Sequence, residues 1–184
     1  MKSSKIIAGV DEVGRGSLIG SVYSAAVVLE KKCNIDNLMD SKKISDKKRR
    51  SLANEIVMHS LSVSIGIASK DEIDSINIHH ATLLSMKRAI NNLNISPDIV
   101  YVDGLYSPDI TIPCNAIVKG DNSVAEISAA SIIAKVARDN EMIYLNKSFE
   151  IYEFDKNKGY GTAKHLETIS YLGKTIHHRE SFLK

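Results

Sequence analysis

Short apolar runs alternate with longer amphipathic segments along the whole chain. Runs that are rich in β-branched residues, or that alternate between apolar and polar positions, are typical of β-strands. Five segments have this character and predict strands: 5–10, 21–29, 62–68, 99–102 and 116–118. In the third, Val63, Ile65 and Ile67 alternate with small or polar residues, which predicts a strand with one buried face.

Four other segments have the spacing of amphipathic helices. They cover residues 46–59, 73–91, 123–144 and 162–172. The helix over 73–91 is expected to be split near Asn77. The segment 123–144 is so rich in alanine and serine that it could approach a sheet closely. Thr162 is placed to cap the last helix.

The first predicted helix has a clear start. The hydroxyl of Ser45 can accept a hydrogen bond from a free backbone N–H of the first turn. Its apolar stripe would consist of Leu52, Ile56 and Leu61. The order of strands and helices predicts a mixed α/β sandwich. No repeat or linker interrupts it, so we expect residues 1–184 to form a single domain.

Composition narrows the class of protein. Of the 184 residues, 43% are hydrophobic and 25% are charged, as in a soluble globular domain. The net charge of +2 does not by itself indicate nucleic-acid binding. Cys33 and Cys114 have no metal-type spacing, which fits a reduced, cytoplasmic protein. The sequence predicts neither a signal peptide nor a membrane span.

Acidic residues follow three of the predicted strands. Asp11 and Glu12 end the first, Asp103 ends the fourth, and Asp121 follows the fifth. Strand ends can converge in a sheet, and converging carboxylates need a positive charge among them. Mg²⁺ or Mn²⁺ would supply it, since hard cations prefer oxygen ligands. Two such ions can promote an in-line phosphoryl displacement. For each acid alone, a solvated loop residue remains the simpler alternative.

Other candidate groups carry weaker signals. The pairs His79–His80 and His177–His178 lack metal-ligand spacing and are expected at the surface. The segment Gly14-Arg15-Gly16 could bring backbone groups and a guanidinium to a phosphate, or form an ordinary turn. The basic stretch 30–50 could contact phosphates or be a solvated surface.

Several motifs together resemble one known family. The segments GVDEVGRGSLIGSVYSAAV, DSKKIS, VDG, KGDNSVAEISAASIIAKVARD and GYGTAKHL occur in the order found in type 2 ribonucleases H, specifically bacterial ribonuclease HII. The matches extend from residue 6 to about residue 182. The combination of DEVGRG with AASIIAKVARD in one chain is highly specific.

The resemblance implies a fold and a reaction. The expected fold is ribonuclease H-like, with a central mixed five-stranded sheet flanked by helices and with extra C-terminal helices. The family's metal-binding and catalytic carboxylates fall on Asp11, Glu12, Asp103 and Asp121, which would hold two Mg²⁺ or Mn²⁺ ions. The expected activity is hydrolysis on the 5′ side of a ribonucleotide, leaving a 5′ phosphate and a 3′ hydroxyl.

The resemblance also implies a set of substrate-binding residues. Gly14, Arg15 and Gly16 would read the 2′-hydroxyl, the group that separates RNA from DNA. Tyr160 would pack on the sugar next to the RNA–DNA junction. Lys42 and Lys43 fall on the family's DSKK segment, where they would contact phosphates.

The chain departs from the family pattern at three positions. Ser17, Ala125 and Gly161 stand where the family often has proline, and Gly161 could loosen the turn beside Tyr160.

No clamp-binding motif of glutamine, hydrophobic and aromatic residues is seen near the C-terminus, so a sliding-clamp tether is not expected. The expected partners are RNA–DNA hybrids and DNA containing ribonucleotides, with no membrane, and the expected state is a monomer. A non-catalytic hybrid binder and another nuclease on the same fold are the alternatives.

Overall fold

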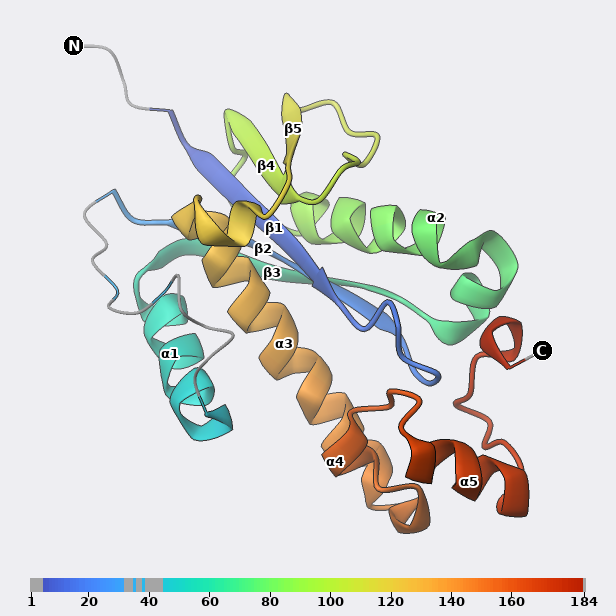
Figure 1. Cartoon of the computed structure of the whole chain (residues 1–184). Helices are drawn as coiled ribbons and strands as arrows, with labels where there is room; N and C mark the ends of the chain where they lie inside the picture. Colours follow the sequence, from blue (N-terminus) through green and yellow to red (C-terminus); the bar gives the residue numbers. More distant parts are fainter. Residues whose placement is uncertain (1–4, 32–34, 36–37, 39–44, 184) are drawn as a thin grey trace.

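The computed structural model describes residues 5–31, 35, 38 and 45–183. Its centre is a five-stranded sheet with the strand order β3-β2-β1-β4-β5, which confirms the predicted mixed sheet (Figure 1). The strands are β1 (Ile7–Val13), β2 (Val22–Leu29), β3 (Ser60–Ala68), β4 (Ile99–Asp103) and β5 (Cys114–Ile117). The pairs β1–β2 and β2–β3 are antiparallel, while β1–β4 and β4–β5 are parallel.

Helices cover both faces of this sheet (Figure 1). α1 (Asp46–Met58) and α3 (Ala125–Asn146) lie on one face and share an apolar core with β2. α2 (Lys70–Asn91) lies on the other face and forms a second core with β1, β2 and β4. The predicted C-terminal helices are present as α4 (Phe154–Asn157) and α5 (Ala163–Leu172). Short 3₁₀ turns cover Gly120–Asn122, Glu150–Tyr152 and Glu180–Phe182.

Three predicted features of the helices are confirmed. The Ser45 hydroxyl accepts from the N–H three residues on, at 3.3 Å, and begins α1. The Thr162 hydroxyl begins α5 in the same way, at 3.2 Å. α2 is broken at Asn77, where φ is 64° and ψ is 165°. No helix in the described ranges is long and apolar enough to cross a membrane.

Two glycines let helices lie directly on the sheet. A Cβ atom at Gly9 in β1 would lie 2.1 Å from the carbonyl carbon of Glu126 in α3. A Cβ atom at Gly66 in β3 would lie 2.0 Å from the carbonyl oxygen of Ser85 in α2. Neither distance is physically possible, so only glycine permits these approaches. The contacts fix α2 and α3 relative to the ends of the strands.

The buried face of β3 is the one that carries small residues. Its fully packed positions are Ser62, Ser64, Gly66 and Ala68. Ile65 and Ile67 on the other face are 37% and 40% exposed, because β3 is an edge strand and α1 covers it only in part. Leu61, predicted for the stripe of α1, lies in β3 instead and is 46% exposed. Close packing of α2, rather than side-chain hydrophobicity, decides which face of β3 is buried.

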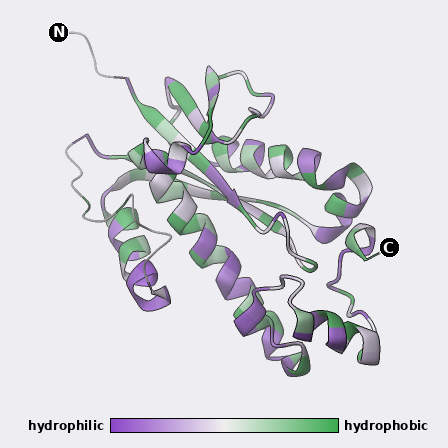
Figure 2. Ribbon diagram, in the orientation of Figure 1, coloured by the Kyte–Doolittle hydropathy of each residue, from purple (hydrophilic) through white to green (hydrophobic). Residues whose placement is uncertain are grey.

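Hydrophilic residues gather on one part of the α1–α3 face. Figure 2 shows the first turns of α1, the middle of α3 and the adjoining part of β1 as hydrophilic. This region lies beside the ends of β1 and β4.

We expect Gly66→Ala to lower the free energy of unfolding by roughly 2 kcal/mol or more, because the added methyl group forces α2 off the sheet. Ile67→Ala, on the opposite face, should cost less than about 1 kcal/mol. Urea denaturation of both variants measures the difference. A larger loss for Ile67→Ala would mean that the apolar face of β3 is the packed one.

Candidate active site

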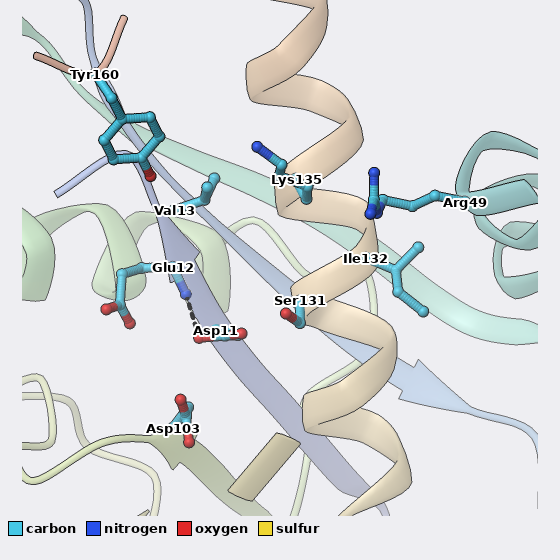
Figure 3. Close-up of a pocket in the computed structure, with 9 residues that line it drawn as sticks. All are labelled: Asp11, Glu12, Val13, Arg49, Asp103, Ser131, Ile132, Lys135 and Tyr160. Atoms are coloured by element: carbon cyan, nitrogen blue, oxygen red, sulfur yellow. Dashed lines mark hydrogen bonds between the residues drawn. The ribbon is translucent and has the colours of Figure 1, made fainter. Parts of the chain in front are cut away.

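A cavity of about 360 Å³ opens where β1 and β4 end, between the sheet and α3 (Figure 3). Its lining combines acids, bases and one aromatic ring. These residues are Asp11, Glu12, Val13, Arg49, Asp103, Ser131, Ile132, Lys135 and Tyr160. The sequence separates them by as many as 149 positions, and the fold brings them together.

The parallel pairing of β1 with β4 places two of the acids. Val10 is paired with Val102, so the residues that follow, Asp11 and Asp103, come from neighbouring strands at the same edge. Both carboxylates project into the cavity in Figure 3. Glu12 is next to Asp11 in an extended strand and therefore points to the opposite side of the sheet. There it also borders a smaller hollow of about 40 Å³.

Burial and mutual repulsion raise the affinity of these acids for protons. Burial, and after it the negative charges of Glu12 and Asp103, raise the pKa of Asp11 to about 8. Burial also raises the pKa of Glu12, against the effect of Arg15, whose guanidinium lies 3.8 Å from its carboxylate. A cluster of buried acids that repel one another favours a bound cation, which lowers the cost of ionising them.

Asp121 lies next to this cluster rather than in the lining of the cavity. It is buried in the 3₁₀ turn after β5, and its carboxylate accepts from Asn122 Nδ2 at 2.9 Å. The preceding N–H, of Gly120, donates to Asp103 Oδ1 at 2.7 Å and ties the two segments together. Within the described residues, no group of three or more His, Cys, Asp or Glu side chains could hold a metal ion as they stand. The oxygen donors suit Mg²⁺ or Mn²⁺, but binding would require some of these side chains to turn.

The predicted loop Gly14-Arg15-Gly16 lies beside the acids. Gly14 has a φ of 93°, and a Cβ there would lie 2.3 Å from Nε of Arg138. Arg15 and Gly16 are exposed, and the Cβ position of Gly16 is 3.6 Å from the ring of Tyr160. The structure therefore brings the loop, the tyrosine and three of the four predicted acids together.

Ser17 contributes contacts that a proline could not make. Its backbone pairs with Tyr160 in an isolated β-bridge. Its hydroxyl lies 3.0 Å from the carbonyl oxygens of both Ile19 and Gly159, and it accepts from Arg138 Nη2 at 2.7 Å. The serine thus joins the loop to the turn that carries Tyr160.

The turn at Tyr160 is held by backbone hydrogen bonds despite Gly161. The N–H of Tyr160 donates to the Asn157 carbonyl at 3.0 Å, and the N–H of Thr162 donates to the Tyr160 carbonyl at 2.8 Å. Gly161 does not adopt the left-handed conformation. Tyr160 is 39% exposed, so its ring borders the cavity and remains accessible.

Sequence reasoning missed two polar residues that line the cavity. Ser131 and Lys135 are one turn apart on α3 and face the acids (Figure 3). The Ser131 hydroxyl opposes the rise in the pKa of Asp11. Lys135 donates to Asp139 at 2.8 Å. Their i, i+4 spacing in a helix was the available signal, because such residues share one face.

The prediction that all four histidines of the two pairs lie at the surface was wrong for His178. His178 is fully buried and packs against His165, because the C-terminal segment folds back over α5. His80 is exposed, while His79 and His177 are partly buried. Lys42 and Lys43, predicted to contact phosphates, lie outside the described residues.

Known proteins share this fold. A family model described as ribonuclease HII matches residues 8–184. The solved ribonuclease H2 of Pyrococcus horikoshii OT3 is 26% identical with a TM-score of 0.81, covering 95% of this chain and 92% of that one. The RNase HII of Archaeoglobus fulgidus, solved in a complex with PCNA, is 27% identical with a TM-score of 0.77, covering 95% and 94%.

A more distant structure extends the comparison. The Bst-RNase HIII in complex with Mn²⁺ is 18% identical with a TM-score of 0.72, covering 93% of this chain and 64% of that one. At this identity the likeness shows the fold alone.

We expect Asp11→Asn to stabilise the protein in the presence of chelator, and the gain should grow with pH. The Asp11 carboxyl has a pKa near 3.8 in the unfolded chain and about 8 in the folded protein. Between these pH values, folding is therefore accompanied by the uptake of one proton. The stability that the wild type gains from the protonated Asp11 is fully present below pH 4 and is lost as the pH rises to about 8. Melting curves from pH 4 to 8 should show a difference of several degrees at pH 8.

The matched control is Asp109→Asn, an exposed acid on the segment after β4. Its melting temperature should follow that of the wild type at every pH. Adding Mg²⁺ or Mn²⁺ at pH 8 should stabilise the wild type more than Asp11→Asn. Equal stabilisation of both would contradict a metal site that contains Asp11.

Proposed function

Since this chain belongs to the ribonuclease HII family, we propose that it cuts the phosphodiester bond on the 5′ side of a ribonucleotide. The substrates are RNA–DNA hybrids and duplex DNA with embedded ribonucleotides, and the products carry a 5′ phosphate and a 3′ hydroxyl. In the cell this activity would start the removal of ribonucleotides from DNA and help to remove RNA primers.

The observation that carries the proposal is the convergence of the acids with the Gly14–Gly16 loop. Asp11, Glu12 and Asp103 line one cavity, and Tyr160 borders the same space. A protein that only bound hybrids would gain nothing from a repulsive group of carboxylates facing phosphates. The arrangement therefore favours hydrolysis over binding alone.

Divalent cations complete this site in the proposal. Asp11, Glu12, Asp103 and Asp121 would hold two ions, Mg²⁺ or Mn²⁺. When bound, the ions supply positive charge that stabilises the phosphate during an in-line displacement. The protein's own contribution is to hold the acids at adjacent strand ends and to keep Asp11 buried beneath α3. Ser131 hydrogen-bonds to the ionised form of Asp11 and helps to keep it available.

Substrate recognition is assigned to the loop and the tyrosine. The exposed backbone of Arg15 and Gly16 would contact the 2′-hydroxyl of the ribonucleotide, and Gly14 provides the turn. The ring of Tyr160 would pack on the adjoining sugar. A deoxyribose would leave the backbone N–H groups of Arg15 and Gly16 without a partner, which disfavours binding of plain DNA.

Basic residues around the cavity would hold the phosphate backbone. Arg49 from α1 and Lys135 from α3 lie on the wall opposite the acids (Figure 3). Lys42 and Lys43 are proposed for the same role from the sequence. Such contacts position the duplex without reading its sequence.

The test is a nicking assay on end-labelled duplex DNA that carries one ribonucleotide. Wild type should nick on the 5′ side of the ribonucleotide with Mg²⁺ or Mn²⁺ and not with chelator. Asp103→Asn should lower the rate by about 10³-fold or more, because it removes a charged oxygen donor. Asp109→Asn, which changes an exposed acid on the segment after β4, should nick like the wild type.

Each other outcome points to a different function. Cutting only within long RNA–DNA hybrids would keep the chemistry and discard the junction specificity. Cutting of plain DNA would indicate another nuclease on the same fold. If Asp103→Asn abolished binding and the wild type cut none of the substrates, the protein would be a hybrid binder.

We also expect the affinity for duplex substrate to fall with salt, because bound phosphates release counterions. Arg49→Ala should lower the affinity and reduce the slope of log K against log salt by about one. Lys87→Ala, on α2 and away from the cavity, is the control. Titration by fluorescence anisotropy at several salt concentrations measures both. An unchanged slope for Arg49→Ala would exclude its phosphate contact.

A further inference from the structure

Two arginines are fully buried behind the Gly14–Gly16 loop. Arg138 in α3 is 1% exposed, and Arg179 in the C-terminal segment is 0% exposed. Within the described part of the chain, neither arginine forms a salt bridge. Buried charges are costly unless polar groups surround them. The partners of these two guanidinium groups are almost all backbone carbonyls.

Arg179 binds the inner side of the loop. Its guanidinium donates to four carbonyl oxygens, those of Gly14 (2.8 Å), Arg15 (2.9 Å), Gly20 (2.9 Å) and Ser21 (3.2 Å). Four carbonyls from an eight-residue loop therefore converge on one side chain. Lysine has no planar fork of donors and could not bind them all at once.

Arg138 holds the same loop from α3. Its Nη2 donates to the Ser17 hydroxyl at 2.7 Å and to the Ile19 carbonyl at 3.1 Å. Its Nη1 donates to the Lys158 carbonyl at 3.0 Å, in the turn that leads to Tyr160. The two arginines thus fix the loop and the tyrosine turn as one unit.

The inward carbonyls determine where the N–H groups of the loop point. In a trans peptide, the C=O and the following N–H point in opposite directions. Because the carbonyls of Gly14 and Arg15 face Arg179, the N–H groups of Arg15 and Gly16 face away from it. Both residues are exposed, and neither N–H donates to another described residue. Arg179 therefore leaves two adjacent donors turned toward solvent at the rim of the cavity.

A pair of histidines ties the same segment to Tyr160. The N–H of Thr175 donates to His178 Nδ1 at 2.8 Å, so the neutral His178 ring carries its proton on Nε2. That Nε2 lies 3.2 Å from His165 Nε2, which must accept. His165 then carries its proton on Nδ1 and donates to the Tyr160 carbonyl at 2.9 Å.

We propose that Arg179 and His165 are positioning residues for recognition of the ribose 2′-hydroxyl. Arg179 presents the N–H groups of Arg15 and Gly16 to the hydroxyl oxygen. His165, oriented by His178, holds Tyr160 against the same sugar. The inference rests on the proposed function and adds residues of the C-terminal region that do not touch the substrate.

The test compares binding of two duplexes in chelator, where neither is cut. One is plain DNA and the other is the same sequence with one ribonucleotide. Wild type should bind the second more tightly. Arg179→Lys should reduce this preference about tenfold while the affinity for plain DNA stays the same, because only the 2′-hydroxyl contact is lost. A misfolded protein would lose affinity for both duplexes.

The matched control is Arg88→Lys. Arg88 also makes several hydrogen bonds, but to Glu72 and to the Ile67 carbonyl of β3 rather than to the Gly14–Gly16 loop. The Arg88→Lys variant should prefer the duplex with one ribonucleotide as strongly as the wild type does. If Arg179→Lys also keeps the preference, the positioning role is overturned and the proposed function stands. If the wild type has no preference, reading of the 2′-hydroxyl fails, and this inference fails with it.

A second pair of variants covers the case in which Arg179→Lys does not fold. His165→Ala should lower the preference for the ribonucleotide, because the Tyr160 carbonyl loses its donor. His165→Asn should restore part of it, since an amide N–H can take the place of Nδ1–H. Equal preference in wild type and both variants would exclude the role of His165.

Discussion

The parallel pairing of β1 with β4 is the constraint on which the site depends. It places Asp11 and Asp103 at the same edge of the sheet, although 92 residues separate them in the chain. An antiparallel pair would send these acids to opposite ends. The same pairing leaves the carboxylates beneath the start of α3, where Gly9 allows the helix to approach closely. Proximity of charge and burial therefore arise together, and both favour a bound cation.

The sequence was sufficient for the order of the five strands and of the helices α1, α2, α3 and α5, because periodicity and capping are local properties. Ser45, Thr162 and the break at Asn77 are where the pattern predicts them. The alternation of apolar and polar residues did not predict which face of β3 is buried, because the buried face depends on how closely α2 packs. The acids could be proposed from strand ends alone. The different positions of Asp121 and Asp103 around the cavity could not be predicted from the sequence, because they depend on the turn after β5.

The buried cations were also beyond the reach of local patterns. Arg138 and Arg179 are buried, and only the folded chain shows that their guanidinium groups donate to backbone carbonyls of the loop. Burying two guanidinium groups costs desolvation free energy, which their hydrogen bonds to the loop offset. What they provide is a fixed shape for a glycine-containing loop that would otherwise have many conformations. The site thus combines an acidic cavity with a neighbouring loop, Gly14–Gly16, that buried arginines hold in place.

The distance along the chain between Gly14 and Arg179 has a consequence for the order of folding. Their hydrogen bond closes a separation of 165 residues, far longer than the 92 that bring β1 to β4. A ribosome releases Arg179 after the sheet and α3 have emerged, and long-range contacts form slowly. The carboxylates can therefore assemble on a nascent chain while the loop still lacks its support. Under the proposed function, the capacity to bind metal would therefore arise before the ability to distinguish ribose from deoxyribose as each chain is synthesised.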